Sequence, residues 1–98
     1  MAPSVDLEAL LRVGRALSDA TRCSILLCLL DGPHYPTQLS EHLGLTKANV
    51  SNHLTSLRES GLVVGTPEGR RVRYQLSDDR LAHAMADLAA LATVERVS

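Results

Sequence analysis

The polar side chains with the clearest chemical potential in this 98-residue chain lie between residues 46 and 74. A single lysine is followed by several small side chains, most of them able to form hydrogen bonds, and later by three closely spaced arginines. Amide, hydroxyl and methyl groups can read base edges, and guanidinium groups bind phosphate. These residue types predict contact with nucleic acid. The candidates are Lys47, Ala48, Asn49, Ser51, Asn52, His53 and Thr55, followed by Arg70, Arg71 and Arg73.

The charge of the chain is unevenly distributed along the sequence. The formal net charge is −1 at pH 7, which by itself does not favour binding to DNA. From Thr46 to Tyr74, however, five basic residues stand against two acidic ones, a net charge of +3, so the rest of the chain carries −4. This asymmetry predicts a basic face on an otherwise acidic body, as phosphate contact requires.

A second set of side chains has the chemistry of metal ligation or redox sensing. It consists of Cys23, Cys28, His34, Asp79, His83 and Asp87. The two cysteines, about 140° apart on a helix, cannot form a disulfide, and core packing is the favoured role because free cysteine behaves as a small hydrophobe. Cys23, at the more polar end and near His34 across a turn, is the better sensing candidate. The stripe at 79, 83 and 87 has metal-ligand spacing, but it lies opposite the apolar face of its helix, so a solvated surface is the favoured interpretation.

The elements that must position these residues follow from hydrophobic periodicity and capping signals. The pattern predicts a mainly α fold with a β-hairpin wing, in which four helices precede the hairpin and one follows it. Because the chain has two tyrosines and no other aromatic residue, the core must be aliphatic. We expect helices at about 6–17, 21–30, 37–43 and 46–60, strands at 62–64 and 71–76 around a turn at 67–69, and a last helix from 77–79 onward.

We interpret residues 1–98 as one winged helix-turn-helix domain, with the helix-turn-helix at about 36–60 and the wing at about 62–76. In the helix predicted at 46–60, Leu54 and Leu57 lie within about 40° of Val50 and define the core side. Asn52 points the opposite way, and His53 is expected to be half-buried or to face phosphate. A solvated face explains the helix alone equally well, but the basic hairpin after it favours DNA contact.

Several stretches of the sequence resemble the ArsR/SmtB family of metal- and stress-responsive repressors. They are Arg15–Arg22, Gln38–Leu45, Val50–Leu54, Leu57–Arg58, Gly61–Val63 and Gly69–Tyr74. The resemblance implies a homodimer closed by the first and last helices and a double-stranded DNA operator with twofold symmetry. It also implies repression relieved by an effector, such as a divalent or thiophilic metal ion.

The familiar metal sites of that family are incomplete in this sequence. The chain most resembles the cadmium- and lead-sensing branch, whose recognition helix carries two thiols, but Ser56 and Ser60 stand at those positions. Serine hydroxyls do not replace thiolates for soft cations. Residues 37–43 lack the cysteines of an arsenic-type site, and only His83 is left of a zinc-type site in the last helix. A DNA-binding regulator that answers to redox state or another signal is therefore the alternative.

Other classes of protein fit the sequence less well. A protein-interaction module would expose more leucine, methionine or aromatic side chains beside residue 52. We predict that the chain is not an enzyme, because it has neither a glycine-rich phosphate loop nor a nucleophile with a placed base. No apolar run reaches the roughly 18 residues of a membrane span, and Asp6 and Glu8 do not suit a secretory signal, so a cytoplasmic location is expected.

Overall fold

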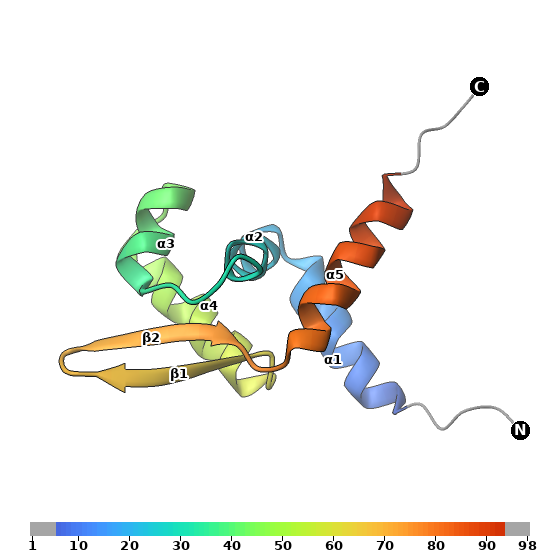
Figure 1. Cartoon of the computed structure of the whole chain (residues 1–98), viewed down its shortest axis with the longest axis horizontal. Coiled ribbons are helices and arrows are strands. Elements are labelled where there is room, and N and C mark those ends of the chain that lie inside the picture. Colours follow the sequence, from blue (N-terminus) through green and yellow to red (C-terminus); the bar gives the residue numbers. More distant parts are fainter. Residues whose placement is uncertain (1–5, 94–98) are drawn as a thin grey trace, which may run out of the picture.

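The computed structural model describes residues 6–93 of the chain (Figure 1). The described part contains five helices and one antiparallel hairpin, and it measures 48 × 37 × 19 Å. The predicted fold class, mainly α with a β-hairpin wing, is confirmed. The elements are α1 (Leu7–Ser18), α2 (Ala20–Leu29), α3 (Pro36–Leu43), α4 (Lys47–Glu59), β1 (Val63–Glu68), β2 (Arg71–Leu76) and α5 (Asp79–Ala92).

Side-chain caps determine where four of the five helices begin. In each, a carboxylate or hydroxyl oxygen accepts a hydrogen bond from a backbone N–H of the first turn, a group that the helix cannot satisfy internally. The second helix is capped by Asp19, whose Oδ2 accepts the amide of Arg22 at 2.9 Å. The four capping residues are Asp6, Asp19, Thr46 and Asp78.

The core is aliphatic, as the composition predicts. No aromatic side chain is among its fully buried members, and Val50, Leu54 and Leu57 of α4 face it as expected. Burial of such side chains is the dominant favourable term in folding. The buried residues are Ala16, Ile25, Leu26, Leu29, Leu39, Val50, Leu54, Leu57, Leu62, Val63 and Met85.

The second helix is less buried than its all-apolar sequence predicts. Ile25, Leu26 and Leu29 enter the core, but Leu27 on the opposite face is 47% exposed and Cys23 is half-buried. The run Ile25–Leu30 is apolar on all sides of a helix and so predicts full burial, which the exposure of Leu27 contradicts. An apolar sequence predicts that a helix packs against other elements. How many of its faces are buried depends on how many helices and strands surround it.

The hairpin differs from the prediction in the length of its first strand. Strand β1 runs on to Glu68, Pro67 pairs with Val72, and the turn consists of Gly69 and Arg70, not of residues 67–69. An edge strand tolerates proline where its nitrogen faces away from the partner strand. Gly69 adopts a φ of 63°, a left-handed conformation that glycine accepts readily.

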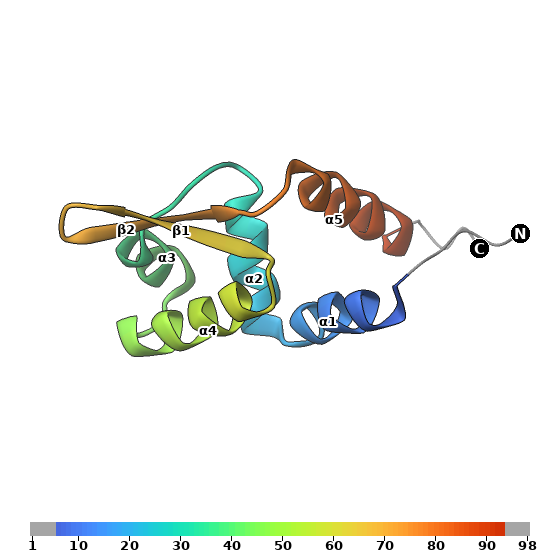
Figure 2. The same cartoon turned by 90° about the horizontal axis from the view of Figure 1, so that it is seen from below.

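The molecule has two distinct ends (Figure 2). The hairpin turn, α3 and the N-terminal end of α4 lie at one end, and α1 and α5 project at the other. Among residues 6–93, five of the seven exposed large hydrophobic side chains belong to these two projecting helices: Leu7, Leu10, Leu11, Leu88 and Leu91. Within the described residues, no helix has the length and hydropathy needed to cross a membrane.

Candidate nucleic-acid interface

The N-terminal half of α4 presents a small polar surface. Thr46 caps the helix by accepting the amide of Asn49 at 3.0 Å, which fixes the direction in which the first turn points. The predicted contact residues of this helix are exposed, with the sole exception of His53. The exposed set is Lys47, Ala48, Asn49, Ser51, Asn52 and Thr55.

His53 is half-buried, which matches one of the two positions expected for it. It lies near Asp19, the cap of α2. The pKa of Asp19 is lowered, chiefly because its carboxylate accepts the backbone N–H of Arg22, with a smaller contribution from His53. His53 therefore faces the junction of α4 with α2 more than the surface around Asn52.

The three wing arginines have different environments. Arg70 lies in the hairpin turn, is exposed, and has no hydrogen bond or ion pair among the described residues. The Arg71 guanidinium stacks on Tyr35, with 3.6 Å between Cζ and the ring centroid. Nε of Arg73 lies 2.8 Å from Oε2 of Glu68, but its N–H does not point along that line, so charge attraction governs the contact.

Tyr35 and Glu68 connect α3 to the wing. The Tyr35 hydroxyl donates a 2.6 Å hydrogen bond to Oε1 of Glu68. This bond, with help from Arg73 and Arg71, lowers the pKa of Glu68, and it raises the pKa of Tyr35. Both groups are thus held in the forms that make the bond, a neutral phenol and a carboxylate. The sequence analysis did not identify either residue, although an aromatic residue before Pro36 and an acid before the hairpin glycine were visible signals.

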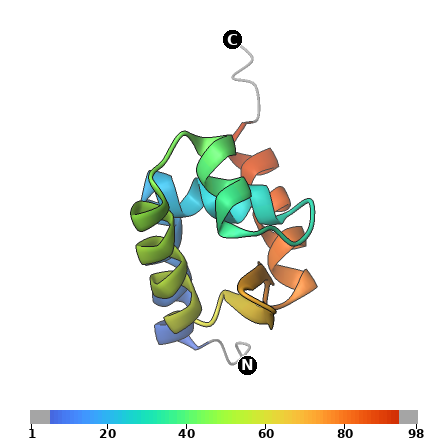
Figure 3. The ribbon, with the colours of Figure 1, turned by 90° about the vertical axis from the view of Figure 1, so that its left-hand side faces the viewer.

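A surface cavity of about 390 Å³ lies between the start of α3 and the wing, beside the contacts that Tyr35 makes. Tyr35 and Thr37 line it on the helix side, and Arg70, Arg71 and Tyr74 line it on the hairpin side. Figure 3 looks at this end of the molecule, with α4 on one side and the hairpin, seen end-on, on the other. The arrangement offers base-reading groups on a helix and cationic groups on a hairpin beside it.

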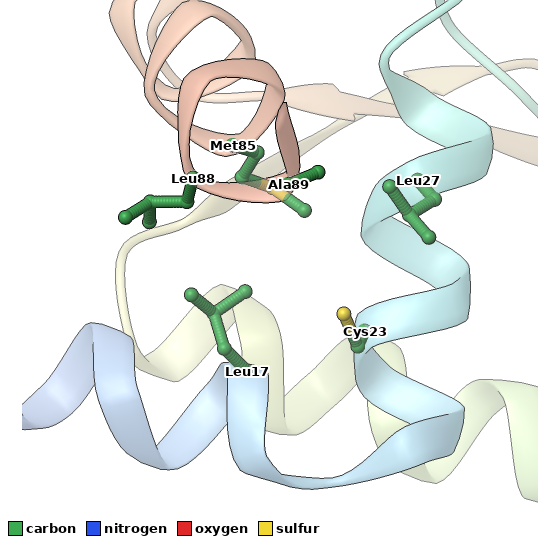
Figure 4. Close-up of a pocket in the computed structure, with 6 residues that line it drawn as sticks. All are labelled: Leu17, Cys23, Leu27, Met85, Leu88 and Ala89. Carbon is green, nitrogen blue, oxygen red and sulfur yellow. The ribbon is translucent and has the colours of Figure 1, made fainter. Parts of the chain in front are cut away.

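The predicted metal and redox residues do not form one site within the chain. Cys23 lines an apolar pocket of about 250 Å³ between α1, α2 and α5, where its sulfur faces Leu17 (Figure 4). His34 lies elsewhere, since its backbone pairs with Tyr74 and its ring contacts His42 edge-on, with 6.0 Å between centroids. Residues 6–93 hold no group of three histidine, cysteine, aspartate or glutamate side chains placed to bind a metal.

The remaining candidates have ordinary surroundings. Cys28 packs against the core, and burial, with a contribution from Asp31, raises the pKa of its thiol, so the unreactive protonated form is favoured. Both cysteines are free, as their spacing predicts. Asp79, His83 and Asp87 are exposed on α5, and Nδ1 of His83 is 3.1 Å from the backbone oxygen of Asp79.

Comparison with known proteins identifies the class of protein to which this arrangement belongs. Residues 19–64, which span α2 to the start of the wing, match the family described as "Bacterial regulatory protein, arsR family". The chain is also 64% identical over 81 residues to the transcriptional regulator CmtR of Mycobacterium tuberculosis, which covers 83% of this chain and 69% of CmtR. The chain belongs to the ArsR family. The predicted class, a DNA-binding transcriptional regulator and not an enzyme, is confirmed for this ArsR-family chain.

Solved structures agree with this assignment. The NMR structure of the cadmium metal-sensor CMTR from M. tuberculosis superposes with a TM-score of 0.69 at 63% identity, covering 80% of this chain and 81% of that one. The homodimeric winged helix-turn-helix DNA-binding domain Mb0332 from Mycobacterium bovis gives 0.83 at 28% identity, covering 95% and 91%. The predicted winged helix-turn-helix architecture is therefore confirmed.

The residues of this ArsR-family member do not fit a soft-metal site in α4. The resemblance implied sensing thiols at positions 56 and 60, where this chain has serines. Both serines are half-buried, and the Ser60 hydroxyl donates to the backbone oxygen of Ser56 at 3.0 Å. Neither hydroxyl supplies the thiolate that cadmium or lead prefers. The likeness to the cadmium sensor is shown for the fold and for the overall sequence, while Ser56 and Ser60 of this chain offer no thiolate to a soft metal.

Proposed function

We propose that this chain is a cytoplasmic, homodimeric repressor that reads a specific operator with the N-terminal half of α4 and grips the DNA backbone with its wing. The single observation that carries this proposal is the exposed face of α4, where Lys47, Asn49 and Asn52 stand clear of the core beside a hairpin that ends in Arg70. Recognition helices contact bases mainly with their N-terminal residues. Ala48, Ser51 and Thr55 complete the proposed base-reading face, and Arg71 and Arg73 are the proposed phosphate contacts of the wing. His53 is a proposed phosphate contact from the flank of α4 nearest the start of α2.

The proposed dimer forms through α1 and α5. Both helices expose leucines that have no partner in one described chain, with Leu7 at 67% and Leu91 at 71% exposure. Large apolar side chains gathered at one end of a small domain mark an interaction surface. A twofold axis there places two recognition helices on successive major grooves, about one helical turn apart, so the operator is expected to be a palindrome.

The proposed effector relieves repression by binding away from α4. A metal ion is the first candidate, because the curated relatives include metal-named repressors such as the probable mercury resistance operon repressor of Streptomyces lividans. Oxidation of Cys23 is the second candidate, favoured by the position of this thiol on an open apolar pocket between the helices of the proposed dimer interface.

A direct test uses the purified protein and its own upstream DNA in a fluorescence anisotropy assay. The proposal expects specific binding by a dimer, and release on addition of one of Zn(II), Cd(II), Pb(II), Cu(I), Ni(II) or As(III), or of an oxidant. Adding each metal ion and the oxidant separately distinguishes the two candidates, and Cys23→Ser, with Cys28→Ser as the matched control, tests whether the Cys23 thiol mediates the release. Absence of specific binding would contradict the repressor proposal, and release by none of the agents would contradict only its effector half.

A further inference from the structure

A hydroxyl and a guanidinium group from different elements converge on one carboxylate, that of Glu68. The Tyr35 hydroxyl donates to Oε1 of Glu68 at 2.6 Å, and Nε of Arg73 lies 2.8 Å from Oε2 of the same carboxylate. The Arg71 guanidinium stacks on the Tyr35 ring, so its charge also stands beside this carboxylate. Each oxygen of Glu68 is therefore held by a different element, one by the start of α3 and the other by β2.

This cluster is at the surface and beside the hairpin turn. Glu68 is the last residue of β1 and pairs with Arg71 across the turn that contains Gly69 and Arg70. The side chains of Arg73 and Glu68 remain 37% and 38% exposed. Exposed ion pairs of this kind are weak because water and salt screen them, so another anion can displace the carboxylate.

The groups around Glu68 are those that proteins use to hold a phosphate. Hydroxyl and guanidinium groups supply much of the hydrogen bonding between proteins and the DNA backbone. A carboxylate and a phosphate both present several acceptor oxygens with negative charge, so the same donor groups can bind either anion. Tyr35 and Arg71 also line the cavity between α3 and the wing, and so does Arg70, which has no hydrogen bond or ion pair among the described residues.

We propose that Tyr35, Arg71 and Arg73 form a binding site for a DNA backbone phosphate, which Glu68 occupies in the free protein as an internal competitor. On DNA binding the Glu68 side chain turns away and a phosphate takes its place. Glu68 thereby lowers the affinity for DNA of every sequence while leaving base reading by α4 unchanged. This inference rests on the proposed contact between the wing and the DNA backbone.

The first test compares Glu68→Gln with the natural dimer. The probe is a fluorescein-labelled duplex of random sequence, about 30 base pairs or three helical turns long. At about 0.15 M salt we expect Glu68→Gln to bind it about three- to fivefold more tightly, which corresponds to the strength of one exposed ion pair. Glu59→Gln removes the same charge from the exposed end of α4 and is the matched control. Its effect should stay below about twofold, because charges beyond about 8 Å are screened at this salt.

The second test asks whether the Tyr35 hydroxyl exchanges one anion for the other. In the Glu68→Gln background a neutral amide oxygen competes for the hydroxyl less strongly than a carboxylate, so the hydroxyl donates to phosphate and Tyr35→Phe should weaken binding about threefold, the value of one hydrogen bond. In the natural background the same change should alter binding by less than about twofold. The phosphate loses one donor, but Glu68 also loses its hydrogen bond to Tyr35 and is displaced more easily. This non-additivity is the signature of a shared site. Thermal unfolding of each variant checks that the fold is retained.

Three results would overturn the inference. Binding by Glu68→Gln that is unchanged or weaker would mean that Glu68 only positions the wing. An equal gain in Glu59→Gln would mean a long-range effect of net charge. Equal effects of Tyr35→Phe in both backgrounds would mean that the hydroxyl does not exchange anions. If Arg70→Ala still weakens binding in these cases, the proposed function stands, whereas a natural dimer that binds neither this duplex nor its own promoter contradicts both.

Discussion

The two ends of this molecule use the same chain for opposite kinds of contact. At the end formed by α3, α4 and the hairpin, side chains are polar or cationic and many are already engaged with one another, as Arg73 is with Glu68. At the end formed by α1 and α5, leucines such as Leu10 and Leu91 stand exposed without a partner. A polar surface can satisfy itself until DNA arrives, whereas an apolar surface is stabilised only when another surface covers it. The polar end is therefore complete in one chain, and the apolar end requires a second.

The largest effect on this comparison is expected from a charge placed at the apolar end. Leu91→Glu should convert the dimer to a monomer, because symmetry buries the carboxylate twice in an apolar interface. Operator affinity should then fall by about 100-fold or more, since the second half-site no longer benefits from linkage. Light scattering and anisotropy measure the two effects.

Ala86→Glu is the matched control for this variant, since it is exposed and about 140° from Leu91 around the same helix. It should remain dimeric. A Leu91→Glu protein that stays dimeric with full affinity would place the interface elsewhere.

At the polar end, the largest effect is expected from the middle of the exposed face of α4. Asn52→Ala should reduce discrimination between operator and mismatched sites by about 1–3 kcal/mol, as expected for loss of a bidentate contact to a base. Competition anisotropy with single-base operator variants measures this. A preference that is unaltered at every position would remove Asn52 from the reading surface.

A smaller and less selective loss is expected in the wing. Arg70→Ala should weaken binding to all sequences about three- to tenfold and lower the slope of log affinity against log salt by about one. Arg80→Ala on α5 is the control, because Arg80 already pairs with Asp78 at 2.7 Å, at the end of the hairpin opposite its turn (Figure 1). Equal effects of the two variants would show that only net charge matters.

The smallest effect concerns the stability of α5 in acid. Asp78 caps this helix and pairs with Arg80, which lowers the pKa of its carboxyl from 3.8 to about 2. A lowered folded-state pKa stabilises the fold above the unfolded value, and this contribution disappears as the pH falls from about 4 to about 2. In urea unfolding followed by circular dichroism, Asp78→Asn should lose this pH dependence while it retains a capping side chain. An identical acid profile in both proteins would contradict this role for Asp78.

Much of the fold was predictable because its signals are local. Asp19 and Thr46 are capping residues next to apolar periodicity, and the narrow stripe of Val50, Leu54 and Leu57 already oriented α4. The basic segment and the family motifs predicted a winged helix-turn-helix, and the comparisons confirm it. Local patterns suffice here because helix ends and faces depend on neighbours within one or two turns.

The tertiary structure decided which of the functional groups are free. By sequence, Arg70, Arg71 and Arg73 were three equivalent wing charges, yet only Arg70 is unengaged, while Arg71 and Arg73 are drawn to Tyr35 and Glu68. It also extended β1 through Pro67 and left Leu27 and Cys23 beside an open pocket. Tyr35 and Glu68 are 33 residues apart, and no periodicity within a window of one helix or strand reports a contact over that separation. The sequence determines the chemical type of each side chain, but the packing of elements distant in the sequence determines which hydrogen-bond or ion-pair partner it has.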